Sequence, residues 1–235
     1  MTQQQHRPER GTSQPVTGRT RALVIGTDKA IYKLATHWLA LINLFWGLYV
    51  GLPFLAPIFM NAGYELPAKV IYTLYRPACH QLPERSFFLF GPRTLYSLDE
   101  LHDAGLVAEG DGPVERQRFL GTPSIGFKAA LCQRDLAMYG SMFVAGLAYG
   151  LWRLLFPRRP LRPLKLWVFG LLLLPMAFDG GTQLLLLRES NWVLRLITGT
   201  LTGVACVWLL YPYLDEAFDD LRRQANKRVH LELEP

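Results

Sequence analysis

Polar residues that could do chemistry stand beside or inside apolar sequence at four places in this chain. The first is CHQ at residues 79–81, followed by PERS at 83–86, and the second is CQRD at 132–135. The third is DGGTQ at 179–183, and the fourth runs from Arg188 through Asn191 and Arg195 to Gly199. Imidazole, thiol and carboxylate groups serve as acids, bases, nucleophiles or metal ligands. Arginine side chains suit the binding of an anion.

Asp179 is the most informative single residue of these strings. It is the one charged residue between Leu166 and Leu187, a run that is otherwise apolar enough to span a membrane. A carboxylate inside a span costs about 2.5–3.5 kcal/mol on insertion scales, so such a residue is usually paired or functional. If the pair is structural, Arg195 is the expected partner. Otherwise Asp179, like His80, is a candidate catalytic acid or base.

Cys79 and Cys132 have three interpretations. On the outer side of a membrane two thiols can persist as a disulfide, and this is the pairing we expect. A bound metal is an alternative that we do not favour, with His80, Cys132 and Asp135 as candidate ligands. Cys132 and Asp135 have the spacing of a chelating pair, whereas the adjacent Cys79 and His80 do not. Free or redox-active thiols are the third interpretation, although no CxxC pair supplies a resolving thiol.

Four apolar runs provide the elements that must hold these strings. A spanning helix needs about 20 predominantly apolar residues. Runs with at most one charge predict spans at about residues 38–62, 136–156, 166–187 and 192–213. The expected fold is all-α: a polytopic membrane protein whose membrane domain, residues 35–214, is a four-helix transmembrane bundle. Residues 1–34 and 215–235 are its tails, and we expect residues 1–20 to be disordered because they have little to bury.

Lysine and arginine residues predict the orientation of these spans. They cluster before the first run, between the second and the third, and after the fourth. Cytoplasmic loops carry such an excess, so we expect a multi-pass protein of the cell membrane with both termini cytoplasmic. The formal net charge of +6 then belongs beside the anionic inner leaflet. Nucleic acid is excluded as a partner because no basic and aromatic binding module appears.

The outer loop, residues 65–135, is too apolar in its first part to be an ordinary loop. Val70, Ile71 and Leu74 recur at helical spacing, which predicts an interfacial or re-entrant helix. Sequence alone does not decide whether residues 67–90 enter the bilayer. Further along, Ser97 and Glu100 have the spacing of a capping box at the start of a short helix.

Alternating spans bring all four polar strings near the outer face. Convergence of separate segments predicts a polar pocket on the extracytoplasmic side. The residues expected to bind a ligand there are Arg85, Arg134, Gln183, Asn191 and Arg195. Three arginines with Gln and Asn suit a small or lipid-derived anion.

Together the strings resemble a family of predicted prokaryotic membrane proteins that share a domain of unknown function. The resemblance covers roughly residues 65–212 and implies membership without implying an activity. Many relatives read Cys-x-Arg-Cys at the second string, where this chain has Asp135, and this departure weakens a thiol-rich metal site. The quoted matches are Cys79-His80-Gln81-x-x-Glu84-Arg85-Ser86-Phe87, Cys132-x-Arg134, Tyr139-Gly140, Asp179-Gly180-x-Thr182-Gln183 and Arg188-x-Ser190-Asn191-x-x-x-Arg195, continuing to Thr198-Gly199.

The sequence therefore favours an integral membrane protein that binds or moves a small anionic ligand. A metal-assisted or thiol-dependent membrane enzyme is one alternative, and a structural or assembly subunit of a membrane complex is another. Whether the protein is an enzyme stays open, as does the identity of any cofactor. The expected partners are membrane lipids, the ligand, and a second copy of the chain or a membrane-complex subunit.

Overall fold

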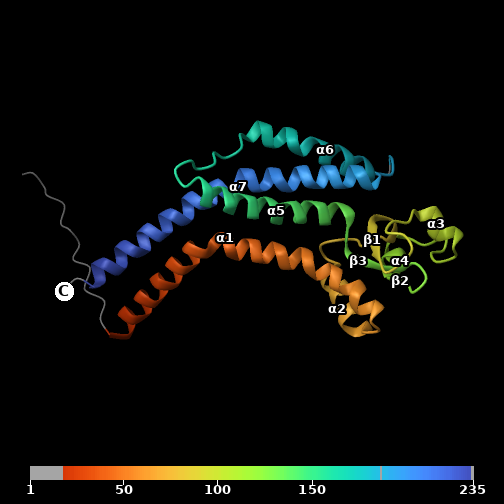
Figure 1. Ribbon diagram of the computed structural model, residues 1–235, viewed down its shortest axis with the longest axis horizontal. Coiled ribbons are helices and arrows are strands. Elements are labelled where there is room, and N and C mark those ends of the chain that lie inside the picture. The colour runs from red at the N-terminus through yellow and green to blue at the C-terminus, as the bar shows by residue number, and fades with distance from the viewer. Residues whose placement is uncertain (1–17, 186, 234–235) are drawn as a thin grey trace, which may run out of the picture. The chain divides into compact units, whose positions relative to one another are not determined.

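The computed structural model describes the backbone of residues 18–185 and 187–233 and the side chains of residues 21–185 and 187–228. These residues are mostly helical (Figure 1). They fall into two compact units, one formed by residues 18–38 with 217–233 and the other by residues 39–216. All the candidate site residues belong to the second unit. The expected disorder of the N-terminal tail concerns residues 1–17 and lies outside the described residues, while the tail from Gly18 onward is helical.

Four long helices correspond to the four predicted spans. They are α1 (Gly18–Asn61), α5 (Gln133–Leu155), α6 (Leu166–Leu184) and α7 (Trp192–Leu233). Among the described residues, α1 and α7 are long and apolar enough to cross a membrane, at Arg21–Asn61 and Trp192–Arg228. Both helices continue beyond the predicted spans, and the charged stretch after residue 214 is part of α7.

Small and aromatic residues pack the helices of the second unit. Trp46 of α1 stacks on Tyr139 of α5, with ring centroids 5.4 Å apart. A Cβ added at Gly199 of α7 would lie 2.6 Å from the Arg134 carbonyl, and one at Gly203 would lie 2.2 Å from the Met138 carbonyl. The two glycines, four residues apart, therefore let α7 approach the backbone of α5 closely, as small residues do between membrane helices.

Two prolines inside the long helices each leave a backbone carbonyl without its helical donor, and a residue distant in the chain donates a hydrogen bond to that carbonyl. A proline has no N–H, so the carbonyl four residues earlier loses its helical partner. Pro53 frees the carbonyl of Tyr49, which accepts a hydrogen bond from the Tyr75 hydroxyl at 2.8 Å. Pro212 frees the carbonyl of Trp208 in α7, and the backbone N–H of residue 164 donates to it at 3.3 Å.

A small antiparallel sheet lies at one end of the four helices (Figure 1). Its strands are β1 (Ser86–Leu89), β2 (Gly121–Thr122) and β3 (Gly126–Cys132), in the order β1-β3-β2. The all-α prediction was therefore incomplete. The β3 segment, GFKAALC, is buried at nearly every position, and a short apolar run of this kind does not reveal by its periodicity whether it is strand or helix.

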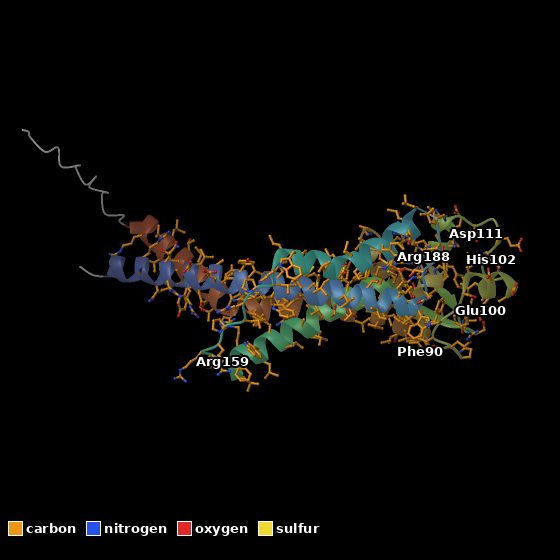
Figure 2. All side chains as sticks on the ribbon, turned by 90° about the horizontal axis from the view of Figure 1, so that it is seen from above. Phe90, Glu100, His102, Asp111, Arg159 and Arg188 are labelled. Atoms are coloured by element: carbon orange, nitrogen blue, oxygen red, sulfur yellow. The ribbon has the colours of Figure 1, made fainter. Side chains whose placement is uncertain are left out.

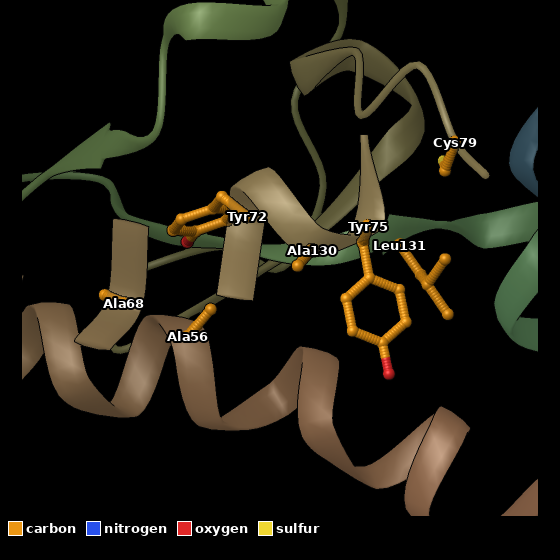
Figure 3. Packing of buried hydrophobic residues seen from close by; sticks show 7 residues of the cluster. All are labelled: Ala56, Ala68, Tyr72, Tyr75, Cys79, Ala130 and Leu131. Atoms are coloured by element: carbon orange, nitrogen blue, oxygen red, sulfur yellow. The ribbon is translucent and has the colours of Figure 1, made fainter. Parts of the chain in front are cut away.

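Short helices complete the segment between α1 and α5. They are α2 (Glu65–Tyr75), the 3-10 turn η1 (Pro83–Arg85), α3 (Leu98–Asp103) and α4 (Pro113–Arg118). The predicted helix at residues 70–75 is confirmed as α2, and the capping box of Ser97 and Glu100 is confirmed at α3. Figure 3 shows how α2 lies against α1 and β3. The buried residues at this contact are Ala56, Ala68, Tyr72, Tyr75, Cys79, Ala130 and Leu131.

Candidate functional site

A polar cavity of about 190 Å³ collects most of the predicted site residues. It lies where the segment before β1 meets the start of α5 and the facing ends of α6 and α7. Pairing of Ser86 with Cys132 in β1 and β3 brings the first two strings together. The predicted residues that line the cavity are Cys79, His80, Arg85, Cys132, Arg134, Asp135, Gln183 and Arg195. Convergence of the four strings is thus confirmed as a structural fact.

Asp179 lies behind this cavity in a dense network of hydrogen bonds. Its side chain is 2% exposed. Oδ2 accepts hydrogen bonds from Arg134 Nη2 at 2.5 Å and Ser190 Oγ at 2.9 Å, and Oδ1 accepts one from Arg188 Nη2 at 2.6 Å. Gln183, one turn along α6, accepts a further hydrogen bond from Arg134 at 3.1 Å. Asp179 is therefore a paired carboxylate that orients Arg134.

Arg195 is not the partner of Asp179, so the expected pair was wrong. Its guanidinium donates to the Ser190 carbonyl at 2.5 Å and to Gln133 Oε1 at 3.1 Å, and it lies 3.6 Å from Glu189. Arg195 thus turns from the first turn of α7 toward the start of α5. The actual partners are Arg188, nine residues away, and Arg134, 45 residues away on α5, and the sequence does not show how the helices bring Arg134 to the carboxylate.

Glu189 joins two of the arginines that line the cavity. Its carboxylate lies 3.2 Å from Arg85 and 3.6 Å from Arg195, yet 70% of its side chain is exposed. This shared pair ties the connection between α6 and α7 to the segment that precedes β1. Because the Glu189 carboxylate is exposed to solvent, both ion pairs are screened and neutralise the arginines only weakly.

Each cavity arginine keeps a buried donor that has no partner. Within the described part of the chain, the Nε atoms of Arg85, Arg134 and Arg195 are buried and make no hydrogen bond. A buried polar atom without a partner costs free energy, so native structures rarely leave one unless a water, an ion or a ligand is missing. Arg116 Nε, outside the cavity, is also buried without a partner, so what sets the cavity lining apart is its charge: three arginines and one carboxylate, Asp135.

A second cluster at the cavity combines two thiols and a carboxylate. The sulfur atoms of Cys79 and Cys132 and a carboxylate oxygen of Asp135 lie within 4.8 Å of one another. His80 lines the cavity but is not part of this group. Cys132 Sγ donates to Asp135 Oδ2 at 3.1 Å. Hydrogen bonding to the Cys132 side chain, together with burial, raises the pKa of the Cys79 thiol.

The expected disulfide is not present, since Cys79 and Cys132 are free thiols in the structure. The hydrogen bonds give a physical reason. Cys79 Sγ accepts the backbone N–H of Gln81 at 3.4 Å and that of Cys132 at 3.2 Å, while the Cys132 sulfur is turned to Asp135.

Asn191 does not line the cavity, although the sequence predicted it as a ligand-binding residue. Its Oδ1 accepts the backbone N–H of Leu194 at 2.8 Å, so it caps the start of α7. Asn191 instead borders a second hollow of about 530 Å³ that reaches Glu84, Ser190 and Arg195.

Lys128 is a buried charged residue that the sequence analysis missed. It stands in the middle of β3 with none of its surface exposed. Its Nζ donates to the carbonyls of Gln81 at 2.5 Å and Gln117 at 2.8 Å. Burial lowers the pKa of Lys128 to about 7. The signal was available, because this lysine is the one charged residue of an apolar seven-residue strand.

Comparison with known proteins assigns the chain to a family. Residues 124–209 match a family model described as "Predicted membrane protein (DUF2085)". The chain is 30% identical to an uncharacterized protein of Methanocaldococcus jannaschii over 168 aligned residues. The aligned region is 69% of this chain and 83% of that protein. The chain belongs to this family of membrane proteins. No solved structure matches it.

Family membership confirms the resemblance found in the sequence and makes this DUF2085 chain a membrane protein in contact with lipid. The family match, residues 124–209, runs from the turn before β3 into α7. It therefore contains Arg134, Asp179 and Arg195, the residues of the charged network.

Proposed function

We propose that the chain crosses the membrane four times, that both termini are cytoplasmic and that residues 35–214 form the membrane domain. Helix length supports counting α5 and α6 as membrane spans in addition to α1 and α7. With 23 and 19 residues, they are about 34 Å and about 28 Å long at 1.5 Å per residue. The hydrocarbon core of a bilayer is about 30 Å thick.

Exposed apolar side chains on α5 and α6 support the same topology. A protein in water rarely leaves a large continuous apolar surface uncovered, whereas lipid covers such a surface. On α5 the exposed residues are Val144, Leu147, Leu151, Trp152, Leu154 and Leu155, and on α6 they are Leu166, Trp167, Leu171, Leu174, Phe178 and Leu184.

Basic residues support the orientation of the four spans. The connection between α5 and α6 contains four of them, as cytoplasmic loops do: Arg158, Arg159, Arg162 and Lys165. In Figure 2, Arg159, which follows α5, lies far from Glu100 and His102 of α3. In this topology the sheet and the polar cavity are on the outer side of the membrane.

Cysteine labelling in intact cells tests the topology. With a membrane-impermeant maleimide, Glu109→Cys should react in intact cells, and Arg159→Cys should react only after permeabilisation. The unmodified chain, whose three cysteines are buried or half-buried, measures background labelling. Reaction of both variants in intact cells would rule out the four-span arrangement.

We infer further that the cavity binds the phosphate or carboxylate group of a small or lipid-derived ligand. The observation that carries this inference is that three arginines, Arg85, Arg134 and Arg195, line one small cavity. Arginine donors match the geometry of phosphate and carboxylate oxygens, and they bind them in pairs. Asp135 is the one carboxylate in the lining, against these three guanidinium groups.

Cavity size narrows the class of ligand. A volume of about 190 Å³ is below the roughly 300 Å³ at which sites for drug-sized molecules begin. The cavity therefore suits one anionic group with a few neighbouring atoms. Inorganic phosphate and the phosphodiester of a lipid headgroup both have this chemistry.

Two probes distinguish these sources. Inorganic phosphate is titrated against the protein in detergent, and phosphatidylglycerol is compared with phosphatidylcholine in nanodiscs by native mass spectrometry. Binding of phosphate alone would indicate a soluble ligand, and selective retention of phosphatidylglycerol would indicate a headgroup. Failure of both probes to bind would refute the proposed function.

Arg85→Gln removes one guanidinium with little structural cost, because its ion pair with Glu189 reaches solvent. We expect at least about tenfold weaker binding, since a hydrogen bond to a charged group contributes about 1.5–3 kcal/mol. Arg93→Gln is the matched control: Arg93 also forms an exposed pair, with Glu100 at 2.6 Å, and lies outside the cavity. Equal loss of binding in both variants would show that the cavity does not hold the anion.

A further inference from the structure

The two thiols and the carboxylate at the cavity have the spacing of a metal site. Ligand atoms of Cys79, Cys132 and Asp135 lie within 4.8 Å of one another. Around a tetrahedral zinc ion, bonds of about 2.0–2.3 Å separate neighbouring ligand atoms by roughly 3.3–3.8 Å. The three atoms therefore need to move little to reach a common ion.

Two backbone N–H groups fix the position of the Cys79 sulfur atom. Its Sγ accepts two backbone N–H groups, from Gln81 and from Cys132. The Cys79 sulfur atom is therefore held by the backbone of both strings, close to the side chains of Cys132 and Asp135.

The loop that carries Cys79 is held rigidly in an uncommon conformation. Gln81 has a φ of 51°, in the left-handed region that favours glycine. Its side-chain amide donates to the Tyr72 carbonyl at 2.8 Å, and its carbonyl accepts Lys128 Nζ. Such a strained residue persists only where its surroundings hold it, and these residues cluster at functional sites.

The other two ligands stand where a strand becomes a helix. Cys132 ends β3 and is the N-cap of α5, and Asp135 lies in the first turn of that helix. Both side chains are half-buried and border the cavity. Cys79 lies in a loop, and all three side chains border the same cavity.

We propose that Cys79, Cys132 and Asp135 bind one thiophilic divalent metal ion, Zn²⁺ or a close analogue, with a fourth position open to the cavity. Thiolate ligands select such ions over Mg²⁺ and Ca²⁺. Three deprotonated ligands and a divalent ion leave one negative charge beside Arg134 and the other cavity arginines. Three protein ligands with one open position are the pattern of catalytic rather than structural zinc sites. The metal site does not depend on the proposed anion binding.

The test measures metal on the full chain, purified in detergent under reducing conditions without a histidine tag. Elemental analysis and Zn²⁺ titration should give one ion per chain. Replacement by Co²⁺ should produce a thiolate-to-metal charge-transfer band. Cys79→Ser and Cys132→Ser should lose the ion. Asp135→Asn should weaken binding at least about tenfold, the lower bound for outer-shell partners of a metal.

Controls separate the site from general damage. Cys206→Ser removes a thiol of α7 that is not part of the cluster, and it should bind Zn²⁺ like the unmodified chain. Arg85→Gln should keep the metal while losing the anion, so the two proposals can fail separately. No Zn²⁺ binding by the reduced chain would overturn the site, as would equal loss in Cys206→Ser. A Cys79–Cys132 disulfide found by thiol counting of the native protein would overturn it as well.

Discussion

Replacing Asp179 by asparagine should destabilise the protein strongly. The change keeps the size of the side chain and removes its charge, which leaves Arg134 and Arg188 without their anion. Oδ1 and Oδ2 together accept three hydrogen bonds from a position that is 2% exposed. Removing one partner of a buried ion pair costs about 3–5 kcal/mol. The arginine side chains remain 17% and 34% exposed, so we expect the lower part of this range.

Reversible unfolding in mixed detergent and dodecyl sulfate, followed by tryptophan fluorescence, measures this loss. Asp99→Asn is the control, since Asp99 is exposed and should change stability by less than about 0.5 kcal/mol. A double-mutant cycle with Arg134→Gln should give a coupling of at least about 1 kcal/mol, because groups in one charged network do not contribute additively. If Asp179→Asn unfolds like the control, the carboxylate does not hold the network together and the reasoning is wrong.

Three further predictions concern packing, capping and a buried charge. Gly203→Ala should lower the free energy of unfolding by about 1–3 kcal/mol through overpacking, since its Cβ would lie 2.2 Å from the Met138 carbonyl oxygen. Gly170→Ala, whose Cβ would have nothing within 4 Å, is the control and should leave stability unchanged in the same unfolding assay. Ser97→Ala removes the capping box of α3 and should cost about 1 kcal/mol, seen as faster amide hydrogen exchange confined to α3. Burial holds the pKa of Lys128 at about 7, below its unfolded value, so the unfolded chain binds more protons above that pH and stability should rise between about pH 7 and 9. Lys128→Met should abolish that rise in stability. If stability depends on pH in the same way in this variant, the pKa of Lys128 is not the cause of the rise.

The sequence predicted the long helices and the meeting of the polar strings well. Uncharged runs of about 20 residues carry their own evidence, because few other structures tolerate such composition. Convergence of the strings was predicted from alternating spans, which would return every second connection to the same side. The structure brings Arg85, Arg134 and Arg195 to one cavity, a placement that this prediction did not specify.

Pairings between distant residues were beyond the sequence. Partner choice for Asp179 depends on how α5, α6 and α7 are rotated, which no local pattern records. The same holds for β3, whose register with β1 sets Cys132 beside Cys79. Lys128 illustrates a missed signal: a lone charge in an apolar strand was visible, but its two carbonyl partners come from residues 81 and 117.

The carbonyls freed by Pro53 and Pro212 have a consequence for how this chain tolerates change. Alanine at position 53 would restore the missing N–H and relieve a defect that costs an isolated helix about 3 kcal/mol. The restored donor would then compete with the Tyr75 hydroxyl for the Tyr49 carbonyl. A substitution that improves α1 by itself would therefore loosen its attachment to α2. Each proline lowers local helix stability and leaves an acceptor free for one distant donor. At these two positions, a helical hydrogen bond and a tertiary hydrogen bond therefore compete for the same carbonyl.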